Sequence, residues 1–574
     1  MRAGGRCAPQ VRFDVSTTLL KDHRVIRETL VDAVRAALGR AGFPEPGGGV
    51  VLTPADRPEH GDWTTNAALQ IAKPAGVPPR EAAQRIADAL MAQPPAHLDR
   101  VEIAGPGFVN LHLSPTWLHD VLRTVAARGD RFGHGDALAG SRINLEFVSA
   151  NPTGPLHAGG GRWVAVGDAL ANLLASQGAE VHREYYLNDA GTQLDLFGAS
   201  LHARYTGADL PDDGYQGQYL IDMADRMRAA LGDDVTMEQA REWGYLQMVD
   251  EIQRDLARIG VVFDTWFSER TLHERGDVQQ VLATLAERGM TRDDDGAVWL
   301  RTSDFGDQRD RVLVKSDGTT TYLCNDLAYH RDKFARGWTH LIDIWGADHH
   351  GQVKSLQAGL EALGFPAGEP EVLLGQLVKL LRGGEEVRIS KRSGTVVTLA
   401  DILDEVDPDV CRLTFLLQGI DTAQTFDLEV VTSQSMENPV YYVQYAHARI
   451  ASIGRQAAAQ GITRLPLPDA NLGVLTHERE LELLRALAVF PDVVEEAAAL
   501  RAPHRVATWV RDFAARFHGF YRDCRVISDD AALTQARLWL AEASRIGLAN
   551  ALAILGVGAP DEMHRADDLE PDAD

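Results

Sequence analysis

A glycine-rich loop after a short apolar run is the stretch whose residue types most clearly suggest chemistry. The run 143–148 is predicted to be a strand, and residues 151–161 form the loop. His157 supplies a side-chain donor, and a helix directly after the loop points free N–H groups and its positive dipole end at the same place. Three consecutive residues without a Cβ let a phosphate approach the main chain: Gly159, Gly160 and Gly161. The loop predicts phosphate binding, although a purely structural turn gives the same pattern on its own.

The elements around this loop are predicted to form a parallel sheet. Residues 162–176 carry apolar side chains at helical spacing, and 181–187 is the next apolar, β-rich run. A strand, a crossover helix and a further strand imply parallel pairing. Ligands of such sheets bind at the carboxyl ends of the strands, where the loop lies.

Three further groups of residues could take part in chemistry. Tyr322 and Asp326 are four apart, which places them on one face of a helix, and a carboxylate beside a hydroxyl suits a guanidinium. A surface aspartate on an amphipathic helix gives the same pattern, and the residues alone favour that interpretation. The basic segment 388–394 could neutralise phosphates, although a solvated loop without a function would carry the same charges. Asp348, His349 and His350 could hold a metal, but adjacent residues rarely converge on one ion, so no protein-bound metal is predicted.

Bulk properties restrict the class of protein. The chain has 574 residues, 45% of them hydrophobic, which predicts several domains with ample cores. No apolar run long enough for a membrane span and no apolar leader segment is recognised, and four widely spaced cysteines form no metal pattern. A reduced, cytoplasmic location is therefore predicted. The net charge of −25 argues against indiscriminate nucleic-acid binding, but a local basic track remains compatible with it.

Motifs that occur in order along the chain carry a family resemblance. They are Asn151-Pro-Thr-Gly-Pro, Tyr186-Leu-Asn-Asp-Ala-Gly, Trp345-Gly-Ala-Asp-His-His-Gly and Tyr442-Val-Gln-Tyr-Ala-His-Ala-Arg. Pro155-Leu-His-Ala-Gly-Gly stands where class I aminoacyl-tRNA synthetases carry His-Ile-Gly-His, and Arg388-Ile-Ser-Lys where they carry Lys-Met-Ser-Lys. Together, over roughly residues 50 to 563, these motifs make the sequence similar to the arginyl-tRNA synthetases.

The resemblance implies an α/β architecture in several parts. Residues 1–20 are left as possible disorder, and 21–130 are expected to form a small α/β domain that contacts tRNA. A Rossmann-like parallel-sheet catalytic domain is expected over 131–408, with a helical insertion at about 215–267 and a mobile basic loop at 388–394. An all-α anticodon-binding domain is expected over 409–563, followed by an acidic tail, 564–574.

The resemblance also implies the reaction and its substrates. The expected activity is ATP-dependent ligation of L-arginine to its tRNA through an arginyl-adenylate, with Mg²⁺ bound to ATP, in a monomer without membrane attachment. The residues implied as catalytic are His157 and Lys391. Those implied in ATP binding are His157, Gly159, Gly160, Gly161, Arg388, Ser390 and Lys391. Those implied in arginine binding are Glu146, Asn151, Tyr322, Asp326 and Asp348.

Contacts with tRNA are implied at two places. Phe108 and Asn110 match positions where the family places an aromatic ring and an amide for an unpaired base, although a core ring and a strand-face amide fit equally well. Near the C-terminus Tyr442, Tyr445 and Arg449 share one helix face, a pattern that a core stripe also gives, and Met563 matches the methionine that usually closes the family's sequences.

Two departures from the family pattern affect the expected activity. Gly160 stands where the second histidine of the motif is expected, which removes a donor unless main-chain N–H groups or water replace it. Arg388 replaces the first lysine of the basic loop, with the same charge but a different geometry. Because His157, Lys391, Tyr322 and Asp326 are all present, an active enzyme is predicted.

Three other hypotheses remain. A nucleotidyltransferase of the same superfamily that acts on a small molecule would not need the long helical C-terminal region. A non-catalytic tRNA-binding paralogue would be expected to lose one of the catalytic residues. A synthetase for glutamine, glutamate or cysteine fits poorly, because no zinc-ligand set is present and Asp326 suits a cation.

Overall fold

The computed structural model describes residues 26–55, 57–387, 397–433 and 438–563. The predicted terminal segments 1–20 and 564–574 and the predicted basic loop 388–394 lie outside the described residues. The chain divides into two compact units that both draw on distant parts of the sequence. The second unit consists of Gly133–Gln456, Phe490–His518 and the segment that begins at Gly547, and the first unit contains the remainder. The domain boundaries expected from sequence therefore stay predictions.

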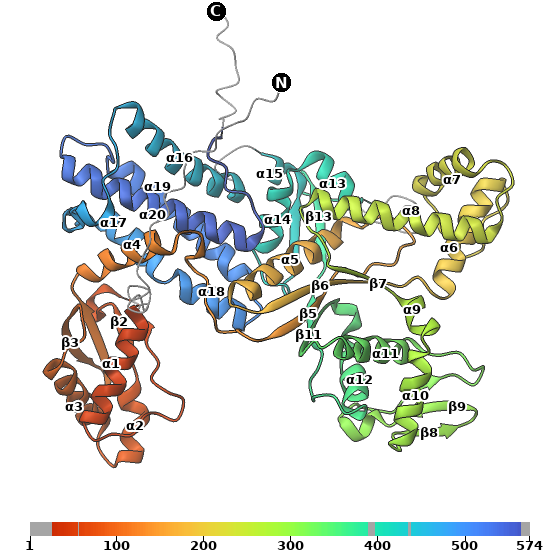
Figure 1. The fold of residues 1–574 in the computed structure, drawn as a ribbon, viewed down its shortest axis with the longest axis horizontal. Helices are drawn as coiled ribbons and strands as arrows, with labels where there is room; N and C mark the ends of the chain where they lie inside the picture. The colour runs from red at the N-terminus through yellow and green to blue at the C-terminus, as the bar shows by residue number, and fades with distance from the viewer. Residues whose placement is uncertain (1–25, 56, 388–396, 434–437, 564–574) are drawn as a thin grey trace, which may run out of the picture. The chain divides into compact units, whose positions relative to one another are not determined.

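A five-stranded parallel sheet is the centre of the second unit (Figure 1). Its spatial order is β12-β11-β5-β6-β7, and every neighbouring pair is parallel. The first strand of this sheet in the sequence is the central strand, β5. The chain then adds β6 and β7 on one side of β5 and later adds β11 and β12 on the opposite side. This reversal between β5 and β11 is the switch point at which such sheets bind ligands. The strands are β5 (Arg142–Glu146), β6 (Glu180–Leu187), β7 (Thr265–Ser268), β11 (His340–Gly346) and β12 (Glu371–Gly375).

The predicted strand–loop–helix–strand unit is confirmed as β5, α5 (Gly161–Ser176) and β6. Helix α5 is buried along nearly its whole length, which explains why its sequence is apolar on more than one face. Gly167 lets this helix approach the sheet, because a Cβ there would lie 2.2 Å from the Phe147 ring. The helices that follow the later strands are α9 (Glu269–Glu274), α10 (Asp277–Glu287), α11 (Tyr322–Ala335) and α12 (His350–Ala362).

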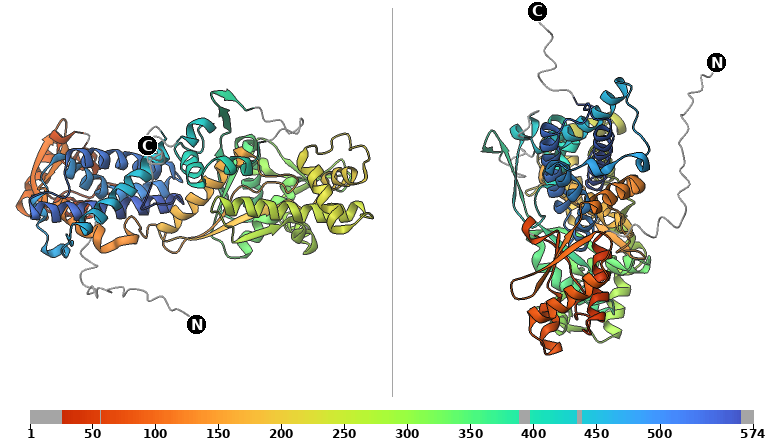
Figure 2. Two further views of the ribbon diagram at one scale, coloured as in Figure 1. Left: turned by 90° about the horizontal axis from the view of Figure 1, so that it is seen from above. Right: turned by 90° about the vertical axis from the view of Figure 1, so that its left-hand side faces the viewer.

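Two smaller groups of elements extend this unit. Helices α6 (Thr192–Thr206), α7 (Gln218–Leu231) and α8 (Met237–Arg258) share a hydrophobic core beyond the β7 edge of the sheet (Figure 2). The N-terminus of α8 is fixed by a capping box between Thr236 and Gln239. A three-stranded antiparallel sheet lies between α10 and α11 in the chain, formed by β8 (Thr291–Asp294), β9 (Ala297–Leu300) and β10 (Arg311–Val314).

The expectation of almost continuous helix from residue 409 onward is wrong in one place. Residues Gln424–Asp427 form strand β15, which pairs in parallel with β13 (Val378–Arg382), and β13 also pairs with β14 (Glu385–Glu386). This pairing joins segments that are far apart in sequence, so no local periodicity announces it. The flanking helices are α13 (Leu399–Glu405), α14 (Pro408–Leu416) and α15 (Leu428–Thr432).

The C-terminal helices are largely as predicted, with one exception. Residues 478–499 form two helices rather than one, with the division at Val489, because Pro491 has no N–H to continue the hydrogen-bond ladder. The observed helices are α16 (Pro439–Ala459), α17 (Glu478–Ala488), α18 (Phe490–Ala499), α19 (His504–Asp523) and α20 (Ala531–Leu555). By length and composition α20 could cross a membrane, contrary to expectation, but 67% of its apolar window is buried within the protein, as in the core helix of a folded bundle.

The first unit contains a small α/β layer structure near its N-terminus. Its four-stranded antiparallel sheet has the order β1-β2-β4-β3, and a single hydrophobic core lies between sheet and helices. The strands are β1 (Thr53–Pro54), β2 (Trp63–Thr65), β3 (Leu98–Ala104) and β4 (Phe108–Leu113), and the helices are α1 (Ile26–Arg40), α2 (Ala67–Ala75) and α3 (Pro79–Ala92). Helix α4 (Thr116–Arg128) follows β4 and contributes no residue to this core.

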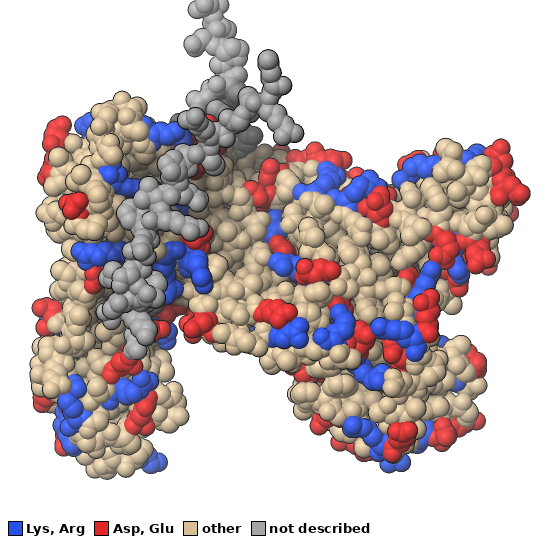
Figure 3. All heavy atoms as spheres, viewed as in Figure 1, with Lys and Arg blue, Asp and Glu red and all other residues tan. Residues whose placement is uncertain are grey.

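On the face drawn in Figure 3, residues of both charge signs occur in scattered groups with broad uncharged areas between them. This distribution and the net charge of −25 do not indicate general binding of polyanions.

Candidate active site

The glycine-rich loop forms a short 3-10 turn that leads directly into α5. The main-chain N–H of Gly159 donates to Nδ1 of His157 over 2.9 Å. Because Nδ1 accepts this bond, the proton of the neutral imidazole lies on Nε2, which becomes the donor. The loop therefore presents a histidine of fixed tautomer at the N-terminus of a 16-residue helix.

The three glycines of this loop have different surroundings. A Cβ at Gly160 would meet nothing within 4 Å, whereas a Cβ at Gly159 would lie 3.2 Å from Nδ1 of His157. A Cβ at Gly161 would lie 3.1 Å from both Leu399 and Phe415. Gly159 and Gly161 thus permit close packing, and Gly160 leaves open the space that the second motif histidine would enter.

Main-chain hydrogen bonds join this loop to the segment after the predicted basic loop. The N–H of Ala158 donates to the carbonyl of Val397 over 3.0 Å, and the N–H of Leu399 donates to the carbonyl of Leu156 over 2.7 Å. The chain is thereby held next to His157 as it leaves residues 388–396. Arg388, Ser390 and Lys391 themselves lie outside the described residues.

Arg162 is a structural residue of this site that sequence reasoning missed. Its side chain is fully buried, and burial lowers the pKa of its guanidinium. The guanidinium donates to three main-chain carbonyls, those of Gln376, Gly419 and Thr422. It fastens the first turn of α5 to segments more than 200 residues away, and the only signal in the sequence was an arginine directly after the glycines.

A buried charge network lies at the switch point of the sheet. Glu146 at the end of β5 and Asp343 in β11 are register partners. Nζ of Lys333 donates to both carboxylates, over 2.6 Å to Glu146 and 3.0 Å to Asp343. The hydroxyl of Ser149 also donates to Glu146, over 2.9 Å. The Glu146 carboxylate is therefore held rigidly at the place where a ligand would enter.

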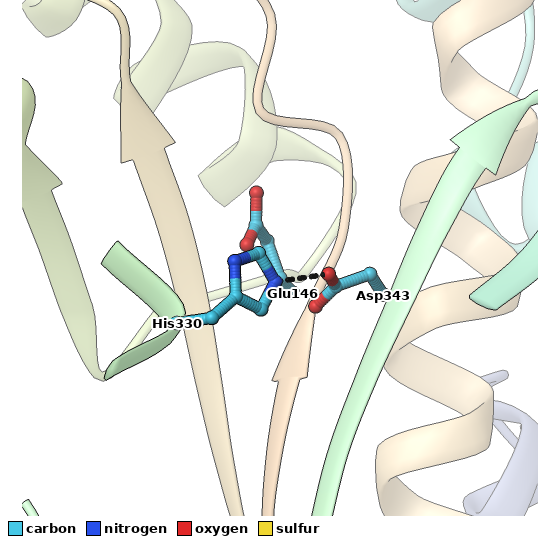
Figure 4. A group of neighbouring side chains, drawn as sticks. All are labelled: Glu146, His330 and Asp343. Atoms are coloured by element: carbon cyan, nitrogen blue, oxygen red, sulfur yellow. Dashed lines mark hydrogen bonds and ion pairs between the residues drawn. The ribbon is translucent and has the colours of Figure 1, made fainter. Parts of the chain in front are cut away.

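The same network contains a cluster that resembles a metal site by composition. Among the described residues, Glu146, His330 and Asp343 bring one ligand atom each to within 4.8 Å of one another (Figure 4). The ammonium group of Lys333, however, already lies against two of these ligands. A bound cation would have to sit beside a fixed positive charge, so the donor set does not fit a metal ion.

Strained backbone follows directly after β5. Val148 and Ser149 have φ of 70° and 38°, and a β-branched residue rarely adopts that conformation. The turn directs the Ser149 hydroxyl to Glu146 and lets the same oxygen accept from the main-chain N–H of Tyr186 over 3.0 Å. Such strain is stored where surrounding structure fixes it, and here it positions the end of β5.

Two carboxylates near this network have no strong cationic partner in the described part of the chain. No side chain there donates to the carboxylate of Asp326. Burial, opposed by the charge of His330 and aided by Glu146 and Glu269, raises the pKa of Asp326 to about 7. Burial also raises the pKa of Glu269, which accepts from the Asn325 amide over 2.7 Å and has only His273, at 3.8 Å, as a basic neighbour. These two acids form an incompletely compensated pair of carboxyl groups that suits a cationic ligand.

Glu269 was missed by sequence reasoning, because it is a single glutamate at a strand–helix junction. Its neighbours in the chain are fixed by Asp189, to which Ser268 donates its hydroxyl and Arg270 its main-chain N–H. The pKa of Tyr186 is well above its ordinary value because of burial and the nearby charge of Glu269. Asp189, buried at the end of β6, thus sets the direction of Glu269.

The remaining predicted arginine-binding residues are more open. Tyr322 begins α11 with 66% of its side chain exposed, one turn before Asp326 on the same helix. The Asn151 amide donates to Gln193 over 2.6 Å. Asp348 and the two histidines after it are exposed beyond β11, where Asp348 lies 3.6 Å from His349. In the described part of the chain, Asp348, His349 and His350 do not form a group of metal ligands.

The two tRNA candidates of the first unit differ in accessibility. Phe108 starts β4 with 39% of its side chain exposed, which leaves a ring surface for stacking. Asn110 is 3% exposed, and its carbonyl oxygen accepts from the Thr64 hydroxyl over 2.8 Å. The Asn110 amide is therefore occupied inside the sheet, which disfavours direct contact with a base.

The aromatic face of α16 is an organised stack. Tyr445 stacks with Tyr441 at 5.8 Å and with His518 of α19 at 6.1 Å between ring centroids. The guanidinium of Arg449 lies 4.4 Å above the Tyr445 ring and donates to its hydroxyl. Tyr442 also packs on His518, with 4.5 Å between ring centroids. All five side chains are only partly buried, so the stack is not simply a core stripe.

The segment before Met563 runs along the same helix. Gln444 donates to the carbonyl of Gly558, and Arg455 donates to that of Asp561. Nδ1 of His447 lies 2.9 Å from the Pro560 carbonyl. These contacts place the half-buried Met563 near the C-terminal part of α16.

Comparison with known families agrees with this geometry. Residues 136–413 match the model for class I tRNA synthetases (R), catalytic domain. Residues 26–113 match the arginyl tRNA synthetase N-terminal domain, and residues 443–563 match the DALR anticodon-binding domain. The parallel sheet with its histidine–glycine loop is thus the catalytic domain of a class I aminoacyl-tRNA synthetase.

Individual relatives define the family more narrowly. The chain is 46% identical to an arginine–tRNA ligase of Syntrophotalea carbinolica over 88% of this chain and 93% of that protein. It is also 46% identical to one of Frankia alni over 93% of this chain and 99% of that protein. The fold matches the Thermus thermophilus arginyl-tRNA synthetase with a TM-score of 0.74, at 22% identity over 94% of this chain and all of that one. The chain belongs to the arginyl-tRNA synthetase family.

Proposed function

We propose that this enzyme ligates L-arginine to its tRNA in two ATP-dependent steps. A carboxylate oxygen of arginine attacks the α-phosphorus of ATP, and the bond to the β-phosphate breaks, which gives arginyl-adenylate and pyrophosphate. A ribose hydroxyl at the 3′ end of tRNA then attacks the arginyl carbonyl and releases AMP. The pair of carboxylates without a strong cationic partner, Asp326 and Glu269, at the ligand edge of the sheet carries this proposal, because it matches a guanidinium and no acidic or neutral side chain.

The glycine-rich loop is assigned to ATP. Main-chain N–H groups of Gly159, Gly160 and Gly161 at the start of α5 and Nε2 of His157 would face the phosphates. Arg388, Ser390 and Lys391 are proposed to bind the phosphates as well, and the attachment of Val397, which follows them in the chain, to Ala158 supports this assignment. Mg²⁺ enters with ATP as part of the substrate. Since no protein nucleophile is required, catalysis would rest on positioning and charge stabilisation.

Arginine is proposed to lie across the ends of β5, β6 and β7. Asp326 and Glu269 would receive the guanidinium, with Tyr322 as an exposed hydroxyl beside them. Glu146 and Asn151 would hold the α-amino and carboxylate end, and Asp348 would shape the pocket beyond β11. The fixed position of Glu146 against Lys333 supports this role, because the carboxylate needs no rearrangement to accept an ammonium group.

Contact with tRNA is proposed at Phe108 in the first unit and at Tyr442, Tyr445, Arg449 and Met563 in the second. The half-exposed aromatic stack with its guanidinium supports base stacking at α16. Asn110 is supported less well than Phe108, since its amide is buried. A cytoplasmic monomer is proposed, in agreement with free, buried thiols at Cys324, Cys411 and Cys524.

The test is ATP–pyrophosphate exchange with each standard amino acid, in the presence and absence of total tRNA. Exchange with arginine alone, dependent on tRNA as the family resemblance implies, is expected. Exchange with another amino acid would refute the assignment of the pocket. Binding of tRNA without exchange would favour the non-catalytic paralogue, and adenylate transfer to a small molecule would favour the nucleotidyltransferase.

A further inference from the structure

His330 is a buried titratable residue to which neither the reaction nor the family motifs assign a role. It lies on α11, one turn after Asp326, and is 2% exposed. Its Nδ1 lies 2.7 Å from the main-chain carbonyl oxygen of Asp326, and its Nε2 lies 2.7 Å from a carboxylate oxygen of Asp343. When Asp343 is ionised, both partner oxygens can accept hydrogen bonds but cannot donate them. Each ring nitrogen must therefore carry a hydrogen, which makes the side chain an imidazolium.

Other groups around His330 agree with this charge. Although burial lowers the pKa of His330, the facing carboxylates of Asp343 and Glu146 outweigh it and hold the pKa above its ordinary value. Lys333, one turn further along the helix, acts in the opposite direction. The cations Lys333 and His330 together balance the carboxylates Glu146 and Asp343. The network is neutral only while His330 is charged.

Asp326 lies directly beside this network. The carboxylates that face it are Glu146 from β5, Glu269 from α9 and Asp343 from β11, and all of them favour its protonated form. The phenol of Tyr186 lies near the same acids and stays neutral. The charge of His330 is the positive contribution that favours the ionised Asp326. Because His330 also bonds the Asp326 carbonyl, it fixes the main chain from which that carboxylate extends.

We propose that His330 is a positioning residue for arginine selection: as an imidazolium held between Asp343 and the main chain of Asp326, it keeps the Asp326 carboxylate ionised and in place for the guanidinium. This inference rests on the proposed function, since it assigns Asp326 to arginine. It adds a residue that does not touch the substrate but determines the charge of one that does.

The expected effect of removing the imidazolium depends on pH. A neighbouring opposite charge lowers the pKa of a carboxyl group by about 1–3 units. Loss of the imidazolium would therefore raise the pKa of Asp326 from about 7 to about 8 or above. Arginine binds the ionised form, so with a shift of about 1–2 units the KM for arginine should rise about 5- to 50-fold at pH 7. At about pH 9, where the carboxylate ionises again, the rise should be no more than about 2-fold.

The experiment compares His330→Gln with the wild-type enzyme between about pH 6 and pH 9, with tRNA present. The matched control is Arg331→Gln, which removes one positive charge from the next position of α11, where the guanidinium lies 3.9 Å from Asp277. The control should leave the pH profile for arginine unchanged. In both variants the KM for ATP should stay near the wild-type value, and thermal unfolding reports whether each is folded.

Each outcome decides between the hypotheses. A rise in the KM for arginine that disappears at high pH supports the inference, whereas a rise by one factor at every pH means that His330 only supports the fold and overturns it. If the wild-type enzyme shows no arginine-dependent activity, the proposed function itself fails. If His330→Gln does not fold, the wild-type protein labelled with ¹⁵N-histidine decides: the inference requires a ring that keeps both hydrogens above about pH 7.5 and responds to arginine, and a spectrum without one refutes it.

Discussion

Alanine substitutions in the glycine-rich loop should have effects of opposite sign at neighbouring positions. Gly160 has φ −67° and ψ −23°, a conformation that alanine adopts readily, and its Cβ would meet no atom within 4 Å. Gly160→Ala should therefore stabilise the protein by about 0.4–1 kcal/mol, because it restricts the unfolded chain. Gly161→Ala should destabilise it by about 1–3 kcal/mol, since its Cβ would lie 3.1 Å from Leu399 and from Phe415.

The third position should affect catalysis more than stability. In Gly159→Ala the new methyl group would lie 3.2 Å from Nδ1 of His157, so the imidazole must move by a few tenths of an ångström. Since a displacement of about 1 Å in an active site can cost about 10²-fold, a shift of this size should lower kcat by about 3- to 10-fold. Gly160→Ala, which leaves His157 untouched, should keep kcat within about 2-fold.

The assays are thermal unfolding and arginine-dependent ATP–pyrophosphate exchange on the three variants. Because a chain of two units need not unfold in one step, the order of the unfolding midpoints is compared rather than a free energy. Gly160→Ala should unfold at or above the wild-type midpoint and Gly161→Ala below it. The reasoning is refuted if Gly160→Ala is the least stable variant, or if it loses activity while Gly159→Ala does not.

Further predictions concern the charges and the aromatic stack. Asp326→Asn should lower kcat/KM for arginine by about 10- to 150-fold, because a hydrogen bond to a charged group contributes about 1.5–3 kcal/mol. The KM for ATP should change little. Because the pKa of Asp326 is raised to about 7 and its ionised form binds arginine, the wild-type KM for arginine should rise about tenfold per pH unit below that value, and this dependence should be absent in Asp326→Asn. Lys333→Met leaves Glu146 and Asp343 without their shared cation and should lower the free energy of chemical unfolding by about 3–5 kcal/mol. Because Lys333 occupies the place of a cation, elemental analysis of the wild-type protein should find no stoichiometric transition metal. Tyr445→Ala should weaken tRNA binding by about 1–3 kcal/mol in a filter assay and leave the KM for arginine unchanged.

The sequence predicted the elements whose pattern is local. The strand–loop–helix–strand unit around His157 and the helices of the C-terminal part follow from apolar spacing and glycine-rich turns. The break between two helices at Val489 could also have been predicted from the sequence, because Pro491 stands two residues beyond it. Strand β15 was not, since it exists only through pairing with β13.

The candidate site was predictable only where a motif marks it. His157 and Asp326 were recognised through motifs, but their charge environment depends on Lys333, which lies 187 residues from its partner Glu146. Neither Lys333 nor His330 stands out from an ordinary polar helix in the sequence. The burial of Asn110, whose side-chain oxygen accepts from the Thr64 hydroxyl, was likewise not evident from the sequence. Such pairings are decided by the assembled fold and not by spacing.

The most direct test of the account is the transfer of labelled amino acids to tRNA, with the ester at the 3′ end identified after digestion. Arginine should be attached in an ATP-dependent reaction, no other standard amino acid should be attached at a comparable rate, and Asp326→Asn should lower the rate for arginine. Attachment of another amino acid, or no attachment by a folded enzyme supplied with ATP and cognate tRNA, would contradict the account.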